Sequence, residues 1–364
     1  MEKILPWLRL KSVPGVGNLL YKRLLDQFGS PELALNASEI ELCRIPGITE
    51  RIARAILSRT ATDADRYEID LAREKGFGVV TLTDPAYPAL LREIPDPPPF
   101  LYVCGNLENT YPCVAVVGSR HATDYGLTAA RRLGSDLAFS GITIVSGMAR
   151  GIDTAAHLGA LDANGNTIAV LGSGLSRVYP SENMELFQQI SRNGAVVSEF
   201  SLNAGPDSHH FPIRNRVISG MSLGTVIVEG SMNSGSLITA RLAVEQGREV
   251  FAVPGSIQSY KSAGTHYLIK QGAKLVQHAG DIIEELEPLL GCPSSIQSRD
   301  GISPACLSPE ENALMEAVGP YPVHIDELAR KLSLAPGKLS SLLLQLELKG
   351  SIRQLPGNFF TRSS

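Results

Sequence analysis

Small residues and arginines recur together at several points in the middle of the chain, and this combination suits an anion. The candidate residues are Gly118, Ser119, Arg120, Ser146, Gly147, Arg177, Arg214, Asn215, Arg216, Ser234 and Gly235. Glycine and serine let a backbone N–H approach a phosphate, and a helix that follows adds the favourable end of its dipole. A guanidinium adds charge and a planar fork that fits phosphate and stacks on bases. We therefore expect the small-residue turns to present N–H groups, and the arginines to supply charge, along a track for a polyanion.

The two arginines of the Arg214-Asn215-Arg216 run are two positions apart. On a helix such residues do not share a face, so we expect at least one of them to pair with an acid such as Glu199 or Glu229. Asp153 fits a capping role as well as a ligand contact. Gly-Ser turns are common between strands and helices, so the prediction depends on five such turns occurring in one region.

The sequence offers groups that hold anions, but no acid, base or nucleophile at an interpretable spacing. Neither GxGxxG after the first strand nor GxxxxGK[ST] occurs, so dinucleotide and P-loop sites lose their main support. Residues 220–224 spell the nucleophile-elbow pattern, but they follow a predicted helix and precede a predicted strand, the reverse of the required order. The five cysteines are scattered without a CxxC, and no two histidines have metal-ligand spacing. We expect no cofactor, no metal and no catalytic residue.

An alternation of short apolar runs and amphipathic segments positions the candidate turns. Strands are predicted at 114–117, 142–145, 167–171, 195–198, 225–228 and 249–253, and helices at about 125–139, 152–163, 182–192, 212–221 and 235–246. Continuous apolar strands that alternate with helices indicate an α/β fold with a doubly wound, mostly parallel sheet. Ligands of such sheets gather beyond the carboxyl ends of the strands, which is where the candidate turns lie.

Composition divides the chain into five segments. Residues 1–65 read as a helical domain with two Pro-Gly turns, typical of tandem helix-hairpin-helix units, and 66–104 as a connector with short strands. Residues 105–290 hold the α/β pattern. Residues 291–306 are half Ser, Pro or Gly and predict a linker, and 307–364 predict a winged helix.

The two terminal domains carry little of the charge that DNA recognition needs. Residues 1–65 contain nine Lys or Arg against eight Asp or Glu, and residues 307–364 contain six of each. The predicted third helix of the winged helix, 336–348, is mostly apolar, whereas reading a DNA groove needs basic and amide side chains. A structural or protein-binding role is favoured over DNA contact for residues 1–65, and a protein-facing or vestigial winged helix for residues 307–364.

The net charge of the chain argues against bulk binding to nucleic acid, but the positions of the arginines leave room for a local anion site. Across 364 residues, 33 Lys and Arg against 37 Asp and Glu leave a net charge of −4, which excludes a polycation that coats nucleic acid by bulk charge. Residues 76–260, however, contain eleven arginines and no lysine. The start of the chain has too short an apolar run for a signal peptide, and no 18-residue apolar span occurs. We expect a reduced, cytoplasmic protein that does not bind membranes.

Taken in chain order, the candidate turns resemble the DprA/Smf family of DNA-processing proteins, which is linked to natural transformation. The matching stretches lie between about 110 and 275, and include Val117-Gly-Ser-Arg120, Ser146-Gly-Met-Ala-Arg-Gly-Ile-Asp153, Leu171-Gly-Ser-Gly174, Phe211-Pro-Ile-Arg-Asn-Arg216, Ser234-Gly-Ser-Leu-Ile-Thr-Ala240 and Ala252-Val-Pro-Gly255. A helical N-terminal domain and a C-terminal winged helix also fit the family.

The resemblance implies an extended Rossmann-like fold and a non-catalytic protein that binds single-stranded DNA. It implies a homodimer that protects incoming strands and helps to load the RecA recombinase. The Gly-Ser-Arg turn at 118–120 carries over as the phosphate-gripping core. Two departures concern the DNA path: residues 181–189 carry no basic residue where relatives often have Lys, and Arg177 stands where some have an aromatic.

Two other functions remain open from the sequence. A Rossmann-like nucleotide hydrolase resembling the nucleoside-monophosphate phosphoribohydrolases could use the same glycine-rich strand ends, but their Pro-Gly-Gly-x-Gly-Thr run is absent. A pure adaptor that acts through its winged helix would bind no single-stranded DNA with residues 105–290.

Overall fold

A computed structural model describes residues 2–108, 110–290, 313–315, 317–318, 323–332, 334, 336–348, 352–355 and 357–362. The chain divides into two compact units, Met1–Ile296 and Gln297–Ser364. The predicted linker at 291–306 lies outside the described residues. Within the described ranges, no helix combines the length and the apolar character needed to cross a membrane.

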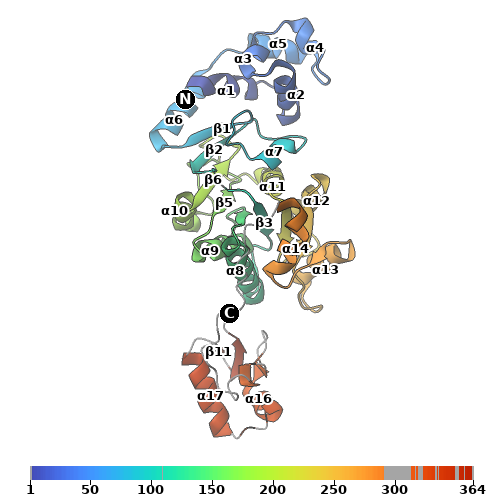
Figure 1. Ribbon diagram of the computed structural model, residues 1–364. Coiled ribbons are helices and arrows are strands. Elements are labelled where there is room, and N and C mark those ends of the chain that lie inside the picture. The colour runs from blue at the N-terminus through green and yellow to red at the C-terminus, as the bar shows by residue number, and fades with distance from the viewer. Residues whose placement is uncertain are drawn as a thin grey trace. The chain divides into compact units, whose positions relative to one another are not determined.

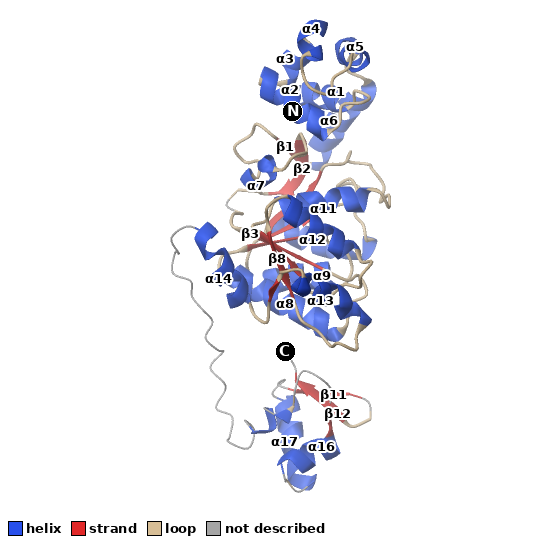
Figure 2. Ribbon diagram, turned by 90° about the vertical axis from the view of Figure 1, so that its right-hand side faces the viewer, coloured by secondary structure: helices blue, strands red, loops and turns tan. Residues whose placement is uncertain are grey.

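The described part of the first unit contains a nine-stranded sheet (Figures 1 and 2). Its strands are β1 (Gly78–Thr81), β2 (Phe100–Gly105), β3 (Cys113–Val117), β4 (Thr143–Ser146), β5 (Thr167–Val170), β6 (Gly194–Ser198), β7 (Gly224–Ile227), β8 (Glu249–Ala252) and β9 (Lys274–Leu275). They lie in the order β1-β2-β6-β5-β4-β3-β7-β8-β9. The six strands predicted from the sequence are β3 to β8, all parallel to their neighbours within that group. The predicted α/β fold is therefore confirmed.

Two strands from outside the predicted α/β segment extend the sheet. Residues 66–104, expected as a connector, supply β1 and β2, which pair antiparallel with each other and with β6. Tyr102 of β2 lies opposite Ser198 of β6, so the register joins positions almost a hundred residues apart. The connector is thus part of the sheet.

Helices cover both faces of the sheet, because alternate residues of a strand point to opposite sides. Val114 and Val116 of β3 belong to one apolar core with α8 (Asp124–Phe139), α9 (Ile152–Asp162) and α14 (Ala279–Leu290). Ala115 and Val117 belong to the other, with α10 (Met184–Arg192), α11 (His210–Gly220) and α12 (Gly235–Glu245). The shorter α7 (Ala89–Glu93) and α13 (Ala263–Lys270) complete the sheet region.

Helices α8 and α9 pack with their backbones in contact, which only glycine allows. A Cβ on Gly134 of α8 would lie 2.5 Å from the carbonyl oxygen of Ala156, and one on Gly159 of α9 would overlap the carbonyl of Arg131. This close packing fixes the position of the two helices against each other.

The N-terminal part of the first unit is all helical (Figure 1). Its helices are α1 (Leu5–Lys11), α2 (Asn18–Phe28), α3 (Pro31–Leu35), α4 (Glu39–Cys43), α5 (Glu50–Ser58) and α6 (Asp63–Lys75). The two Pro-Gly turns have the same backbone form, with φ of +92° at Gly15 and +93° at Gly47. Each turn leads into a helix, which agrees with the predicted tandem of hairpins.

The second unit has the strands and helices of a winged helix. It contains β10 (Val323–His324), α16 (Ile325–Leu332), α17 (Pro336–Leu348), β11 (Ile352–Leu355) and β12 (Phe359–Arg362), in a sheet of order β10-β12-β11. The helix predicted at 309–318 falls only partly within the described residues. Leucines of α16 and α17 form the core, while Leu344 and Gln345 are exposed on α17.

Candidate nucleic-acid interface

The candidate turns lie at one edge of the sheet. Strands β3, β4 and β5 are parallel neighbours, so the loops that follow them leave the sheet side by side. Strand β3 lies between β4 and β7 in the sheet. After β3 the chain adds β4, β5 and β6 on one side of β3, and then β7 and β8 on its other side. The end of β3 is therefore the point where the strand order reverses. Crevices at such points are the usual binding places of open α/β sheets.

The Gly-Ser-Arg turn at 118–120 keeps its backbone donors free. Within the described residues, the N–H groups of these three positions have no acceptor. Gly118 must be glycine, because a Cβ would lie 2.7 Å from the side chain of Ile152 and 2.9 Å from the carbonyl oxygen of Glu229. Successive free N–H groups at a tight turn form a concave site for an anion.

The side chain of Arg120 is exposed and has no carboxylate partner among the described residues. Its guanidinium carbon lies 4.9 Å from the ring centre of Phe211, a cation–π contact. The ring of Tyr179 lies 5.8 Å from the same Phe211 ring, and Tyr179 is 42% exposed. Arg120, Tyr179 and Phe211 are here called the arginine–aromatic patch. Arg177, two residues before Tyr179, is also exposed and unpaired within the described part of the chain.

The N-terminus of α12 offers a second set of free donors. Ser234 is the N-cap residue but does not cap with its side chain, because its hydroxyl lies 2.8 Å from the hydroxyl of Ser236. The N–H groups of Gly235 and Ser236 have no acceptor among the described residues. Asn215 reaches this helix end, with its amide nitrogen 3.5 Å from the carbonyl oxygen of Gly235.

The turn after β4 does not present donors as predicted. The buried hydroxyl of Ser146 donates to the carbonyl of Val116 at 2.6 Å. The N–H of Gly147 donates to Asp153 at 3.1 Å, so it is already satisfied inside the protein. Internal acceptors therefore occupy both groups, and DNA contact by Ser146 and Gly147 stays a prediction without a free donor to support it.

Arg214 and Arg216 are also used internally. Arg214 is 4% exposed and donates to the carbonyl of Gly147 at 2.8 Å and to that of Val170. Burial lowers its pKa to about 10, and burial raises the pKa of its neighbour Asp153. Arg216 is 6% exposed and forms ion pairs with Glu199 and, at 3.3 Å, with Asp96.

The expected pairing of one arginine with Glu199 is thus confirmed. Helix α11 turns both side chains into the protein, so DNA contact by Arg214 or Arg216 has no exposed guanidinium to support it and stays a prediction.

Glu229 has a role that the sequence did not indicate. This 4% exposed carboxylate accepts from the N–H of Thr123 at 3.0 Å and from the Thr123 hydroxyl. Thr123 is the N-cap of α8, and Gly126 makes room because a Cβ there would lie 2.6 Å from the carboxyl carbon. The side chain from the end of β7 therefore holds the start of the helix that follows β3.

The first Pro-Gly hairpin faces this same region. The amide nitrogen of Asn18, at the start of α2, lies 3.3 Å from the carboxylate of Glu199, and Lys11 donates to Asn18. Burial lowers the pKa of Lys11. Together with Arg216 these residues form a partly buried polar junction between the N-terminal helices and the sheet.

Three family profiles match the chain, and together they cover most of it. Residues 78–287 match DNA recombination-mediator protein A, residues 302–358 match the DprA winged helix domain, and residues 8–61 match a SAM-like helix-hairpin-helix tandem. The first profile alone covers more than half of the chain.

The chain belongs to the DprA/Smf family. It is 35% identical to Protein Smf of Synechocystis, with 98% of each chain aligned, and 43% identical to Protein Smf of Escherichia coli, with 75% of this chain and 74% of the relative aligned. Members of this family are DNA-processing, recombination-mediator proteins.

Two solved structures of the family share the fold. DNA processing protein A of Streptococcus pneumoniae has a TM-score of 0.66 at 36% identity, covering 77% of this chain and 96% of its own. The protein from Helicobacter pylori has a TM-score of 0.53 at 31% identity, covering 59% and 98%, and its structure gives insights into its single-stranded DNA binding mode.

The two aromatic residues of the patch were missing from the predicted set. Tyr179 precedes Pro180 and Phe211 precedes Pro212, and an aromatic beside proline close to anion-capable turns was the signal that could have found them. Among the described residues, no group of three or more His, Cys, Asp or Glu side chains is placed to hold a metal.

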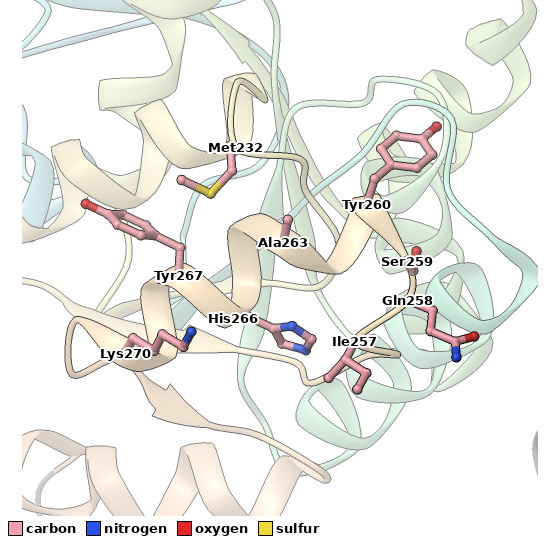
Figure 3. A pocket seen from close by; sticks show the side chains of 9 residues that line it. All are labelled: Met232, Ile257, Gln258, Ser259, Tyr260, Ala263, His266, Tyr267 and Lys270. Carbon is pink, nitrogen blue, oxygen red and sulfur yellow. The ribbon is translucent and has the colours of Figure 1, made fainter.

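A further surface lies on α13, where a cavity of about 500 Å³ opens beside the 232 loop (Figure 3). Its rim exposes Met232 (50%), Ile257 (91%), Tyr260 (72%) and Tyr267 (44%). Large apolar side chains gathered in this way on a surface are typical of protein contacts.

Proposed function

We propose that this DprA/Smf protein binds single-stranded DNA at the carboxyl edge of its parallel strands. The observation that carries the proposal is the arginine–aromatic patch beside the free N–H groups of 118–120. It combines an unpaired guanidinium, free backbone donors and two rings with exposed surface. Proteins that bind single strands without sequence preference use charge for the backbone and stacking for the bases.

In this proposal each group has one task. Arg120 and the N–H groups of Gly118 and Ser119 hold one phosphate, and the rings of Tyr179 and Phe211 stack on neighbouring bases. Arg177, Asn215 and the free start of α12 at Ser234 and Gly235 extend the track. None of these tasks is a chemical step, so the protein acts by binding and not as an enzyme. Residues 105–290, completed by β1 and β2, are the DNA-binding part.

The strand bound in this way is passed on, in the cytoplasm, to the RecA recombinase during DNA uptake. The family membership supports this step. We also propose a homodimer, and the apolar rim around the α13 cavity supports a protein partner at that surface. RecA assembly on a single strand, timed with and without this protein, tests the transfer, and equal rates would count against it.

The experiment for DNA binding is a fluorescence-anisotropy titration of the full chain with labelled oligo(dT), at two salt concentrations. Arg120→Ala should weaken binding by about 1–3 kcal/mol, which is roughly 5- to 150-fold, because it removes a charge-assisted phosphate contact. The slope of log affinity against log salt should fall by about 0.7, the value for one contact to a single strand.

Arg131→Ala is the matched control. Arg131 is an exposed arginine of α8 paired with Asp162, so its loss should leave both affinity and slope unchanged. Equal binding by wild type and Arg120→Ala at both salt concentrations would remove Arg120 from the site. Absence of wild-type binding would overturn the proposed function.

A further inference from the structure

Two buried charges hold the loop after β4 from opposite sides. Asp153 of α9 accepts hydrogen bonds from the N–H of Gly147 at 3.1 Å and of Ala149 at 3.4 Å. Arg214 of α11 donates to the carbonyl of Gly147, and to Val170 at the end of β5. The residues are 6% and 4% exposed. Both backbone groups of Gly147 therefore depend on side chains, one acidic and one basic.

The fit around Gly147 leaves no room for another arrangement. A Cβ at Gly147 would overlap the guanidinium of Arg214, so the loop lies directly against that group. The next residue, Met148, is fully buried with φ of +54°, a backbone form that costs free energy for a residue other than glycine. The surrounding hydrogen bonds must therefore maintain this bend.

The same loop supports the Gly-Ser-Arg turn. At its far end the N–H of Ile152 donates to the carbonyl of Ser119 at 3.2 Å. Gly151 lies against the carbonyls of Ser119 and Arg120, closer than a Cβ could approach. Any shift of residues 147–151 would consequently move the turn that carries the free N–H groups and Arg120.

We propose that Asp153 and Arg214 are positioning residues for single-stranded DNA binding, which fix the Gly-Ser-Arg turn through the 147–151 loop without touching DNA. This inference builds on the proposed function. A binding group works best when its supporting residues fix it before the ligand arrives. Buried side chains can supply that support, because the interior excludes the water that would otherwise satisfy the bent backbone.

The test uses the double variant Asp153→Asn/Arg214→Met, which avoids leaving one charge buried alone. In the full chain it should weaken oligo(dT) binding by about the same factor as Arg120→Ala, roughly 5- to 150-fold, and lower the salt slope by about 0.7. Added to Arg120→Ala, it should cause no further loss, because the two changes remove the same contact.

Three other results would overturn the inference. In the triple variant, the affinity losses of Arg120→Ala and of the double variant could multiply, and the salt slope could fall by twice the single-contact value. Arg214 would then be a phosphate contact in its own right. The double variant could have a lowered melting temperature and yet bind oligo(dT) with wild-type affinity at temperatures where it is fully folded. The pair would then be structural only. Should the double variant not fold, Arg214→Lys alone keeps a positive charge opposite Asp153 but lacks the planar fork that reaches the carbonyls of both Gly147 and Val170. It should then weaken binding and lower the salt slope, and wild-type values for it would refute the positioning role.

These outcomes differ from a failure of the proposed function. If wild type binds oligo(dT) and Arg120→Ala binds weakly, the DNA site stands whatever the double variant does. If wild type does not bind, the function and this inference both fall.

Discussion

His157 of α9 makes the stability of the first unit depend on pH. The ring is fully buried, with Nδ1 lying 2.7 Å from the hydroxyl of Thr167. That hydroxyl donates its proton to the carbonyl of Ile144, so Nδ1 must carry a proton and donate to Thr167. Nε2 is then an unprotonated nitrogen, and it has no partner among the described residues. Protonating it would bury a charge without a partner.

The size of the effect follows from the pKa in the two states. Burial, aided by the charge of Arg214, lowers the pKa of His157 to about 3, whereas in the unfolded chain it is about 6.5. Above about pH 6.5 neither state binds the proton, and the stability is complete. As pH falls below that value only the unfolded chain is protonated, so the free energy of unfolding drops by about 1.4 kcal/mol per pH unit. At about pH 5 the loss is about 2 kcal/mol.

Urea unfolding at about pH 7.5 and about pH 5 measures this loss. The fluorescence of Trp7, the single tryptophan, reports on the first unit. Wild type should lose about 2 kcal/mol more between the two pH values than His157→Gln. His209→Gln, which changes an exposed histidine, should keep the wild-type difference. Equal losses for wild type and His157→Gln would refute a histidine that is neutral because it is buried.

Two further substitutions test the packing and the buried charges. Gly134→Ala should lower the free energy of unfolding by about 1–3 kcal/mol, because its methyl group would meet a backbone carbonyl of α9. The control Gly280→Ala meets only a movable side chain and should stay within about 1 kcal/mol of wild type. Arg216→Met should cost about 3–5 kcal/mol, because it leaves the carboxylate of Glu199 buried, and it should not change the salt slope of DNA binding. A slope that falls by about 0.7 would place Arg216 on the DNA after all.

Local patterns were enough to predict the central fold. Each of β3 to β8 is a short apolar run buried on both faces, such as Cys113–Val117, and a strand of this kind can be recognised without knowing its neighbours. The antiparallel edge was not predictable in this way. Strand β2 pairs with β6 across almost a hundred residues, and nothing near Phe100–Gly105 specifies that partner.

The site shows the same limit more clearly. Arg120 was predicted as a charge at the sheet edge, and it is exposed there. Arg214 has the same residue type and lies in a family stretch, but it is buried because α11 brings it under the loop at Gly147. Whether an arginine is exposed depends on its tertiary contacts with carbonyls and carboxylates. The spacing of residues along the sequence does not reveal those contacts.

The contact between Glu229 and Thr123 has a consequence for how firmly this protein can grip its ligand. In doubly wound folds the helix after the first parallel strand commonly receives a phosphate at its N-terminus. Here that position already holds a carboxylate of the protein itself, so the start of α8 is occupied by Glu229. In the proposed complex, DNA phosphates meet guanidinium and loop donors at the exposed edge, where salt ions compete with them. Contacts of this kind exchange readily with salt ions, which agrees with the proposed transfer of the strand to another protein.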